Sequence, residues 1–173
     1  MPQNVEIKCH CEDLDRVRAI LLQNNIAFVS AERQVDTYFR TPHGRLKLRE
    51  GEIDNHLIHY MRDDDAGPSH SEVLLFEATP GSNLKTILSN ALGVLILVEK
   101  RREIWRSDNV KIHLDEVKHL GNFLEIEAID QTERIGKNRL RKQCEHFIRL
   151  LQLDVQSLVP QSYSDLLLQQ NAE

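Results

Sequence analysis

The sequence has no long apolar run. No stretch approaches the roughly 18 consecutive apolar residues that a membrane-spanning helix needs. The first residues, MPQNVEIK, also lack the hydrophobic stretch of a secretory signal. These absences argue against a membrane protein and against a secreted one, so we expect a cytoplasmic protein without a membrane partner.

Cysteine is scarce as well. The three cysteines, Cys9, Cys11 and Cys144, cannot all form disulfides, and their spacing matches no zinc-ligand pattern. We therefore expect reduced thiols that take no part in metal binding.

Basic residues are outnumbered by acidic ones. The chain has 22 lysine and arginine residues against 27 aspartate and glutamate residues, which gives a formal net charge of −5. A general nucleic-acid binder usually carries a basic domain, so this balance argues against one and leaves only a phosphorylated end as a nucleic-acid target. An anionic ligand must instead meet cations that are focused locally, in a cleft with low-dielectric walls.

The remaining composition is that of an ordinary globular protein. The chain has 173 residues, of which 40% are hydrophobic and 28% charged, and this is the usual size of one domain with a sizeable core. Neither an internal repeat nor a low-complexity linker divides it. We therefore expect a single domain over residues 1–173.

Short segments that alternate polar and apolar residues are the most informative feature that is present. In a strand, residues two apart point to the same side of the sheet. The titratable residues that share a face in this way are, segment by segment, Glu6 and Lys8; Arg45, Lys47 and Arg49; Lys100 and Arg102; Lys111, His113 and Asp115; and Glu125 and Glu127, while Arg62 ends a further run. One such segment is typical of the solvated face of an antiparallel sheet. Their recurrence favours a shared charged interior.

The same periodicity predicts the order of the elements. Strands are expected at residues 4–11, 35–40, 45–50, 57–62, 72–79, 95–106, 110–117 and 123–129, and helices at 14–23, 83–92, 137–151 and 162–168, the last with Ser164 or Asp165 near its cap. The polar stretch 63–69 contains three successive aspartates and is predicted to be a solvated loop rather than a metal site.

An inward charged face on so many strands favours an antiparallel barrel over a flat sheet. The amphipathic helices at 14–23 and 137–151 can cover the outward apolar faces of such a barrel. Isolated buried ions are strongly disfavoured, so the interior must stay wet or hold a compensating ligand and metal. The pattern therefore predicts an open tunnel instead of a filled core.

Six segments, in this order along the chain, resemble those of a known family. They are Val5-Glu6-Ile7-Lys8, Val35-Asp36-Thr37-Tyr38-Phe39, Gly44-Arg45-Leu46-Lys47-Leu48-Arg49-Glu50, Lys100-x-Arg102 before Trp105, Leu114-Asp115-x-Val117 with Leu120-Gly121, and Phe123-x-Glu125-Ile126-Glu127. The chain resembles the CYTH family, also called triphosphate tunnel metalloenzymes, over nearly its whole length. With the terminal segment 162–167, it is most similar to the class IV adenylate cyclase (CyaB-like) branch.

The resemblance implies an α+β fold, an eight-stranded antiparallel β-barrel with flanking helices around a tunnel that binds a triphosphate. It implies Glu6, Glu125 and Glu127 as ligands of Mg²⁺ or Mn²⁺; Lys8 and Asp115 as catalytic groups; and Lys8, Arg45, Lys47, Arg49, Arg62, Lys100 and Arg102 as phosphate contacts. The first glutamate of the family's Glu-x-Glu-x-Lys signature is Asn4 here. A hard cation can still bind one or two carboxylates with waters and phosphates, but the departure puts a second metal in question.

The group that attacks the triphosphate decides the activity. The resemblance implies an adenylate cyclase, in which the 3′-hydroxyl of ATP attacks the α-phosphorus and releases cyclic AMP and pyrophosphate. Attack of water on the terminal phosphorus would make a triphosphatase acting on tripolyphosphate or an organic triphosphate, and water could also open a cyclic phosphate. Asn4 favours a third hypothesis, a non-catalytic module that binds polyphosphate or a nucleotide. The sequence leaves a homodimer open.

Overall fold

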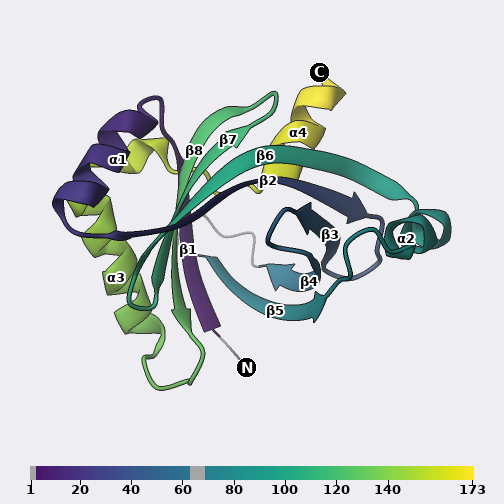
Figure 1. Cartoon of the computed structure of the whole chain (residues 1–173), viewed down its shortest axis with the longest axis horizontal. Helices are drawn as coiled ribbons and strands as arrows, with labels where there is room; N and C mark the ends of the chain where they lie inside the picture. The colour runs from purple at the N-terminus through teal and green to yellow at the C-terminus, as the bar shows by residue number, and fades with distance from the viewer. Residues whose placement is uncertain (1–2, 63–68) are drawn as a thin grey trace.

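The computed structural model describes residues 3–62 and 69–173 (Figure 1). The side chains of Arg62 and of residues 69–72 are outside this description. The loop predicted at 63–69 lies almost wholly outside the described residues.

Eight antiparallel strands form the body of the fold. They are β1 (Gln3–His10), β2 (Ala27–Phe39), β3 (Arg45–Gly51), β4 (His56–Arg62), β5 (Ser69–Glu77), β6 (Val94–Ser107), β7 (Val110–Val117) and β8 (Gly121–Asp130). Their order, β1-β5-β4-β3-β2-β6-β7-β8, closes into a barrel. Among the residues that the structure describes, β1 pairs with β5 through Val5 with His70 and Glu6 with Ser69. The predicted α+β fold with an eight-stranded antiparallel barrel is confirmed.

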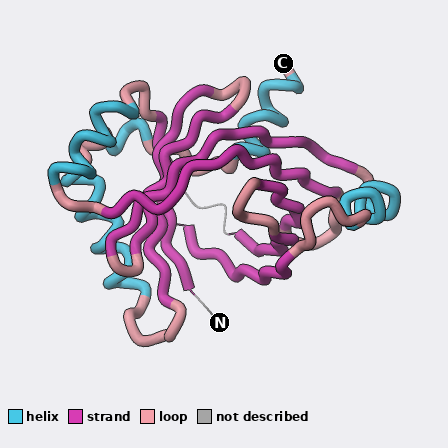
Figure 2. The backbone as a smooth tube through the Cα atoms, viewed as in Figure 1, coloured by secondary structure: helices cyan, strands magenta, loops and turns pink. Residues whose placement is uncertain are grey.

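Four helices flank the strands (Figure 2). They are α1 (Leu14–Gln23), α2 (Leu84–Leu92), α3 (Lys137–Leu150) and α4 (Tyr163–Ala172), with a short 3-10 turn at Val155–Ser157 before α4. Within residues 3–62 and 69–173, no helix is long and apolar enough to cross a membrane.

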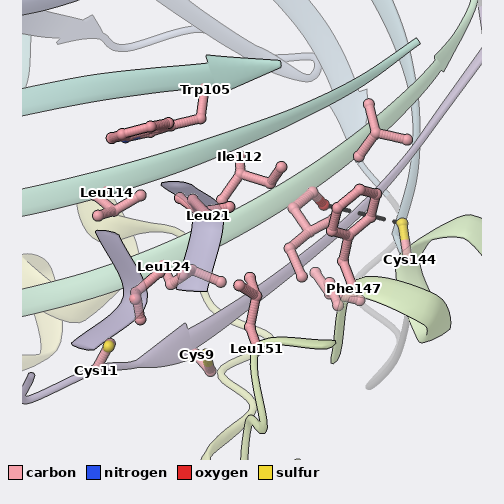
Figure 3. Packing of buried hydrophobic residues seen from close by; sticks show 14 of the residues in the cluster. Cys9, Cys11, Leu21, Trp105, Ile112, Leu114, Leu124, Cys144, Phe147 and Leu151 are labelled. Atoms are coloured by element: carbon pink, nitrogen blue, oxygen red, sulfur yellow. Dashed lines mark hydrogen bonds between the residues drawn. The ribbon is translucent and has the colours of Figure 1, made fainter. Parts of the chain in front are cut away.

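The main core lies between α1, α3 and the outer faces of β1, β6, β7 and β8 (Figure 3). Leu21 of α1, Ile112 of β7 and Leu140 of α3 have no exposed surface. Burying each such aliphatic side chain contributes roughly 1.5–3 kcal/mol. The two amphipathic helices therefore cover the outer side of these strands, as the sequence predicted.

The three cysteines belong to this core. Cys9, Cys11 and Cys144 are buried and carry free thiols. Burial raises the pKa of both the Cys9 and the Cys144 thiols to about 12, so neither is a thiolate at neutral pH. This agrees with the expectation of reduced thiols.

The strand register places the charged residues on the inner face. Directly opposite strand partners share a face. The opposed pairs are Asp36 with Arg49, Tyr38 with Lys47, Arg102 with Asp115, His113 with Glu125, Lys8 with Glu125, and Glu6 with Glu127. Six strands, β1, β2, β3, β6, β7 and β8, thus contribute polar groups to one interior, which confirms the prediction drawn from their alternation.

One end of that interior is apolar. Tyr38, Val98, Val117 and Phe123 share the inner face with the charged residues, and α4 packs Tyr163 and Leu167 against them. The interior is therefore not charged along its whole length, and α4 packs against one end of it.

Most element boundaries lie within four residues of the sequence prediction, and the start of β2 differs by more. β2 begins at Ala27, eight residues before the predicted start at residue 35. The sequence pattern did not predict this start, because the register with β6 shifts between Phe28 and Ser30 and interrupts the alternation of inward and outward side chains there. The N-cap of α4 is Ser162, whose hydroxyl forms a capping box with Asp165, so Ser164 and Asp165 lie near the cap as predicted.

Candidate functional site

A buried cluster of cations surrounds Asp36 of β2. Lys47 Nζ on β3 lies 3.0 Å from Asp36 Oδ2, and Lys100 Nζ on β6 lies 3.1 Å from the same oxygen. Arg49 of β3 donates from Nε to Oδ1 at 2.8 Å and from Nη2 to Oδ2 at 2.9 Å. The predicted phosphate contacts Lys47, Arg49 and Lys100 are therefore brought together, around one carboxylate.

Burial and the neighbouring charges shift the pKa values of Asp36 and Lys100. Burial would raise the pKa of Asp36, but Arg49, Lys100 and Lys47 hold it well below its usual range. Burial lowers the pKa of Lys100 to about 7, although Asp36 opposes that shift. Near neutral pH, Lys100 can therefore gain or lose a proton when the charge beside it changes.

Arg102 of β6 is the centre of a second buried network. Its Nε and Nη2 donate to the two oxygens of Asp115 at 2.7 and 2.6 Å, and Nη2 also reaches Glu125 Oε2 at 2.8 Å. The hydroxyl of Tyr163 on α4 donates to Asp115 Oδ2 at 2.7 Å. Both oxygens of Asp115, a predicted catalytic group, thus accept from Arg102, and one of them also accepts from Tyr163 of α4.

Lys8 of β1 extends this network. Its Nζ lies 3.5 Å from Glu125 Oε1, donates to the carbonyl of Gln161 at 3.2 Å and lies 4.3 Å from the centre of the Tyr163 ring. His113 Nδ1 lies 3.3 Å from Glu125 Oε2. Burial would raise the pKa of Glu125, but Arg102 and Lys8 lower it far below its usual range.

A third group of polar residues lies on β1 and β8. Glu6 and Glu127 are opposed strand partners. Asn4 Nδ2 donates to Glu127 Oε1 at 3.0 Å, while Asn4 Oδ1 is buried and accepts no hydrogen bond from the described residues. Asn4 therefore occupies the same face as the two carboxylates and offers an oxygen without a partner.

This third group fits a hard divalent cation. Mg²⁺ prefers oxygen ligands and binds through one or two carboxylates with waters and phosphates, and two carboxylates with an amide oxygen supply such a set. Over the described ranges, no three His, Cys, Asp or Glu side chains are arranged as a metal site. Glu125, predicted as a ligand beside Glu6 and Glu127, is engaged by Arg102 and Lys8 instead. Its metal role stays a prediction.

Arg45 lies apart from the Asp36 cluster, at the α4 end. Its Nη1 donates to Ser162 Oγ at 2.7 Å, to Asp165 Oδ1 at 2.8 Å and to Ser164 Oγ at 3.3 Å. A cavity of about 390 Å³ opens there, lined among others by Tyr38, Arg45 and Asp165. This volume lies within the range of sites for small organic molecules.

Sequence reasoning placed most of these residues and missed others. The side chain of Arg62 lies outside the described part of the chain, so its phosphate role stays a prediction. Asp36 and Tyr163 were not singled out as site residues, although both bind predicted ones. Strand parity could have placed Asp36 inside, since it shares a face with Tyr38. Nothing in the alternation could have found Tyr163, which comes from a helix.

Acid should unfold the protein through these carboxylates. The folded-state pKa values of Asp36 and Glu125 lie well below their ordinary values near 4, so their stabilisation is complete above about pH 4 and is lost as the pH falls toward the folded values. Each unit of depression contributes about 1.4 kcal/mol. Urea unfolding between pH 3 and pH 7 should show a steep loss of stability below pH 4. A free energy of unfolding that is unchanged at pH 3 would contradict these ion pairs.

The CYTH domain family model matches residues 2–163. No curated protein matches the chain.

Several solved structures share the fold. The PH1012 protein from Pyrococcus horikoshii OT3 has a TM-score of 0.81 at 23% identity, covering 94% of this chain and 98% of that one. A proposed adenylate cyclase from Vibrio parahaemolyticus has a TM-score of 0.75 at 19% identity, covering 95% and 97%. The proposed adenylyl cyclase HpAC1 from Hippeastrum, for which a dominant triphosphatase activity is stated, has a TM-score of 0.64 at 14% identity, covering 100% and 97%. At these identities the likeness shows the fold alone.

Proposed function

Because this chain belongs to the CYTH domain family, we propose that it binds a triphosphate inside the barrel and carries out divalent-metal-dependent phosphoryl or nucleotidyl transfer on it. The observation that carries the proposal is the convergence of Lys47, Arg49 and Lys100 on the inner face of the barrel. Three buried cations on two neighbouring strands suit a ligand with several closely spaced negative charges.

The basic residues would position the substrate. Phosphoryl transfer depends mainly on positioning the phosphate chain for in-line attack and on stabilising its charge, and these are the main contributions of the protein. Lys47 and Lys100 supply ammonium groups that act as point charges, while Arg49 offers a planar fork that matches two phosphate oxygens. Arg102, oriented by Asp115, would contact the same chain from β6.

Glu6 and Glu127, with Asn4 Oδ1, would hold Mg²⁺ or Mn²⁺. When bound, the cation neutralises charge that develops on the phosphate oxygens. The carboxylates and the amide lie on the inner face of β1 and β8, which the register makes continuous with Lys8 and Glu125. The protein would thus keep cations for the phosphates and oxygen ligands for the metal on adjoining parts of one surface.

Lys8 would contact the attacking oxygen or a phosphate. Its ammonium is held between Glu125 and the carbonyl of Gln161 and retains a donor for a ligand, because an ammonium group has three. Asp115 would act through Arg102 as a positioning residue, since both of its oxygens already accept from Arg102 and one also from Tyr163. The sequence predicted a catalytic group at this position, and the proposed role of Asp115 is instead to orient Arg102.

The cavity beside Arg45 favours an organic triphosphate such as ATP over tripolyphosphate. It offers space next to the aromatic side chain of Tyr38 for the part of a substrate beyond its phosphates. A cyclase reaction on ATP is our first proposal. A triphosphatase is the second, and the dominant triphosphatase activity stated for the Hippeastrum protein of the same fold favours it.

Product analysis tests the proposal. The purified protein is incubated with ATP or tripolyphosphate, with Mg²⁺, with Mn²⁺ or with a chelator, and phosphate, pyrophosphate and cyclic AMP are resolved. Cyclic AMP with pyrophosphate identifies a cyclase, and phosphate release identifies a triphosphatase. If the protein binds both ligands but shows no metal-dependent turnover, the proposed enzyme activity is wrong and the protein is a binding module.

A further inference from the structure

Asp36 occupies the donors that a phosphate would need. Lys47 and Lys100 both direct Nζ at Asp36 Oδ2, and Arg49 commits Nε and Nη2 to the same carboxylate. The remaining terminal nitrogen of Arg49, Nη1, is 3.1 Å from Asp54 Oδ2. The proposed phosphate site therefore already holds an anion that belongs to the protein.

The environment of Asp36 makes this arrangement strong. The side chain of Asp36 is 2% exposed and that of Lys100 is 1% exposed, so water screens their attraction weakly. An uncompensated buried cation would be costly, and here three cations approach one another. Asp36 removes part of that repulsion and satisfies one donor of each lysine.

We propose that Asp36 is an internal counter-ion that holds the three cations together in the empty barrel and competes with the triphosphate for them. The proposal rests on the proposed function and deepens it, because it assigns a residue that sets the affinity of the site. A triphosphate carries several negative charges against one on Asp36, so it can take over the same donors. Part of its attraction is nevertheless offset by the carboxylate that stays nearby.

The Asp36→Asn variant tests the competition. Asparagine is nearly the same size and leaves the cations without a competing charge. Calorimetric titration with tripolyphosphate, without metal and at pH 6 so that Lys100 is largely protonated in the wild type, should give a dissociation constant at least ~10-fold lower than for the wild type, which corresponds to about 1.4 kcal/mol. The empty variant should melt at a lower temperature, and tripolyphosphate should raise its melting temperature more than that of the wild type.

Glu32→Gln is the matched control. Glu32 lies on the same face of β2 and is 3% exposed as a residue, but its oxygens accept from Gln34 Nε2 and from the backbone N–H groups of Ile53 and Asp54. Removing its charge perturbs a buried carboxylate of β2 outside the cation cluster. We expect this variant to bind tripolyphosphate with the affinity of the wild type.

The outcomes separate this inference from the proposed function. Binding of tripolyphosphate by the wild type tests the proposed function. The ratio of the dissociation constants of Asp36→Asn and the wild type tests whether Asp36 competes with the ligand. Equal or weaker binding by Asp36→Asn would mean that the carboxylate supports the anion site, and the inference would be overturned. If the variant does not fold alone, refolding with tripolyphosphate should restore it, because the ligand replaces the missing charge. Failure of that rescue would equally overturn the inference.

Discussion

The Arg102→Met variant should lose about 3–5 kcal/mol of unfolding free energy, as is usual when one partner of a buried ion pair is removed. Arg102 compensates both Asp115 and Glu125, and none of the three side chains is more than 8% exposed. Methionine fills the space but leaves two buried carboxylates with weaker partners. Urea denaturation at pH 7 measures the loss directly.

Arg101→Met is the control for this substitution. Arg101 is the preceding residue of β6 and faces outward. Its side chain is 46% exposed and pairs with Glu103 and Glu116. An exposed pair of this kind contributes about 0–1 kcal/mol. The loss of unfolding free energy in Arg102→Met should also become smaller below pH 5, because protonation of Asp115 and Glu125 removes their uncompensated charge. Equal stability of the two variants would contradict the buried network.

Glu127→Gln should lower metal-dependent turnover at limiting Mg²⁺ or Mn²⁺ by at least ~10-fold while the protein stays folded. A ten-fold loss of metal affinity corresponds to about 1.4 kcal/mol, and a carboxylate is a much stronger ligand for these hard cations than an amide. Higher metal concentration should restore part of the activity. Turnover measured against metal concentration checks the prediction.

Glu125→Gln gives the contrasting result. From the sequence, the two glutamates look equivalent, and neither substitution should affect the fold. The structure changes that expectation for Glu125, which is paired with Arg102 and Lys8, so its variant should be less stable than Glu127→Gln. If the two variants were equally stable and lost metal-dependent turnover to the same extent, Glu125 and Glu127 would be equivalent metal ligands, as the sequence suggests.

The inner face of the barrel could be predicted because strand alternation does not depend on which strands are neighbours. Leu48 shows this clearly, since it lies between Lys47 and Arg49 and is buried in an outer apolar cluster with Phe39 and Ala78. A period of two residues fixes which side a residue faces once the strand exists. The first half of β2 escaped prediction where an irregular register interrupted that period.

The partners on that face could not be predicted, because they depend on the order and register of the strands. Glu125 and Glu127 are two residues apart and face the same way, yet Glu125 lies opposite Lys8 and Glu127 opposite Glu6. One glutamate therefore meets a cation and the other a second carboxylate. The role of Asp36 likewise arises only when β2 is flanked by β3 and β6.

Calorimetric titration of tripolyphosphate in the presence of Mg²⁺ tests the central claim most directly, with the wild type, Lys47→Met and Lys118→Met compared. Lys118 is an exposed lysine paired with Glu99 and serves as the control. The account predicts that the wild type and Lys118→Met bind equally, and that Lys47→Met binds tripolyphosphate at least ~10-fold more weakly, a loss of about 1.4 kcal/mol, with a smaller effect on orthophosphate. Absence of binding to the wild type, or equal binding by all three proteins, would contradict a triphosphate site inside the barrel.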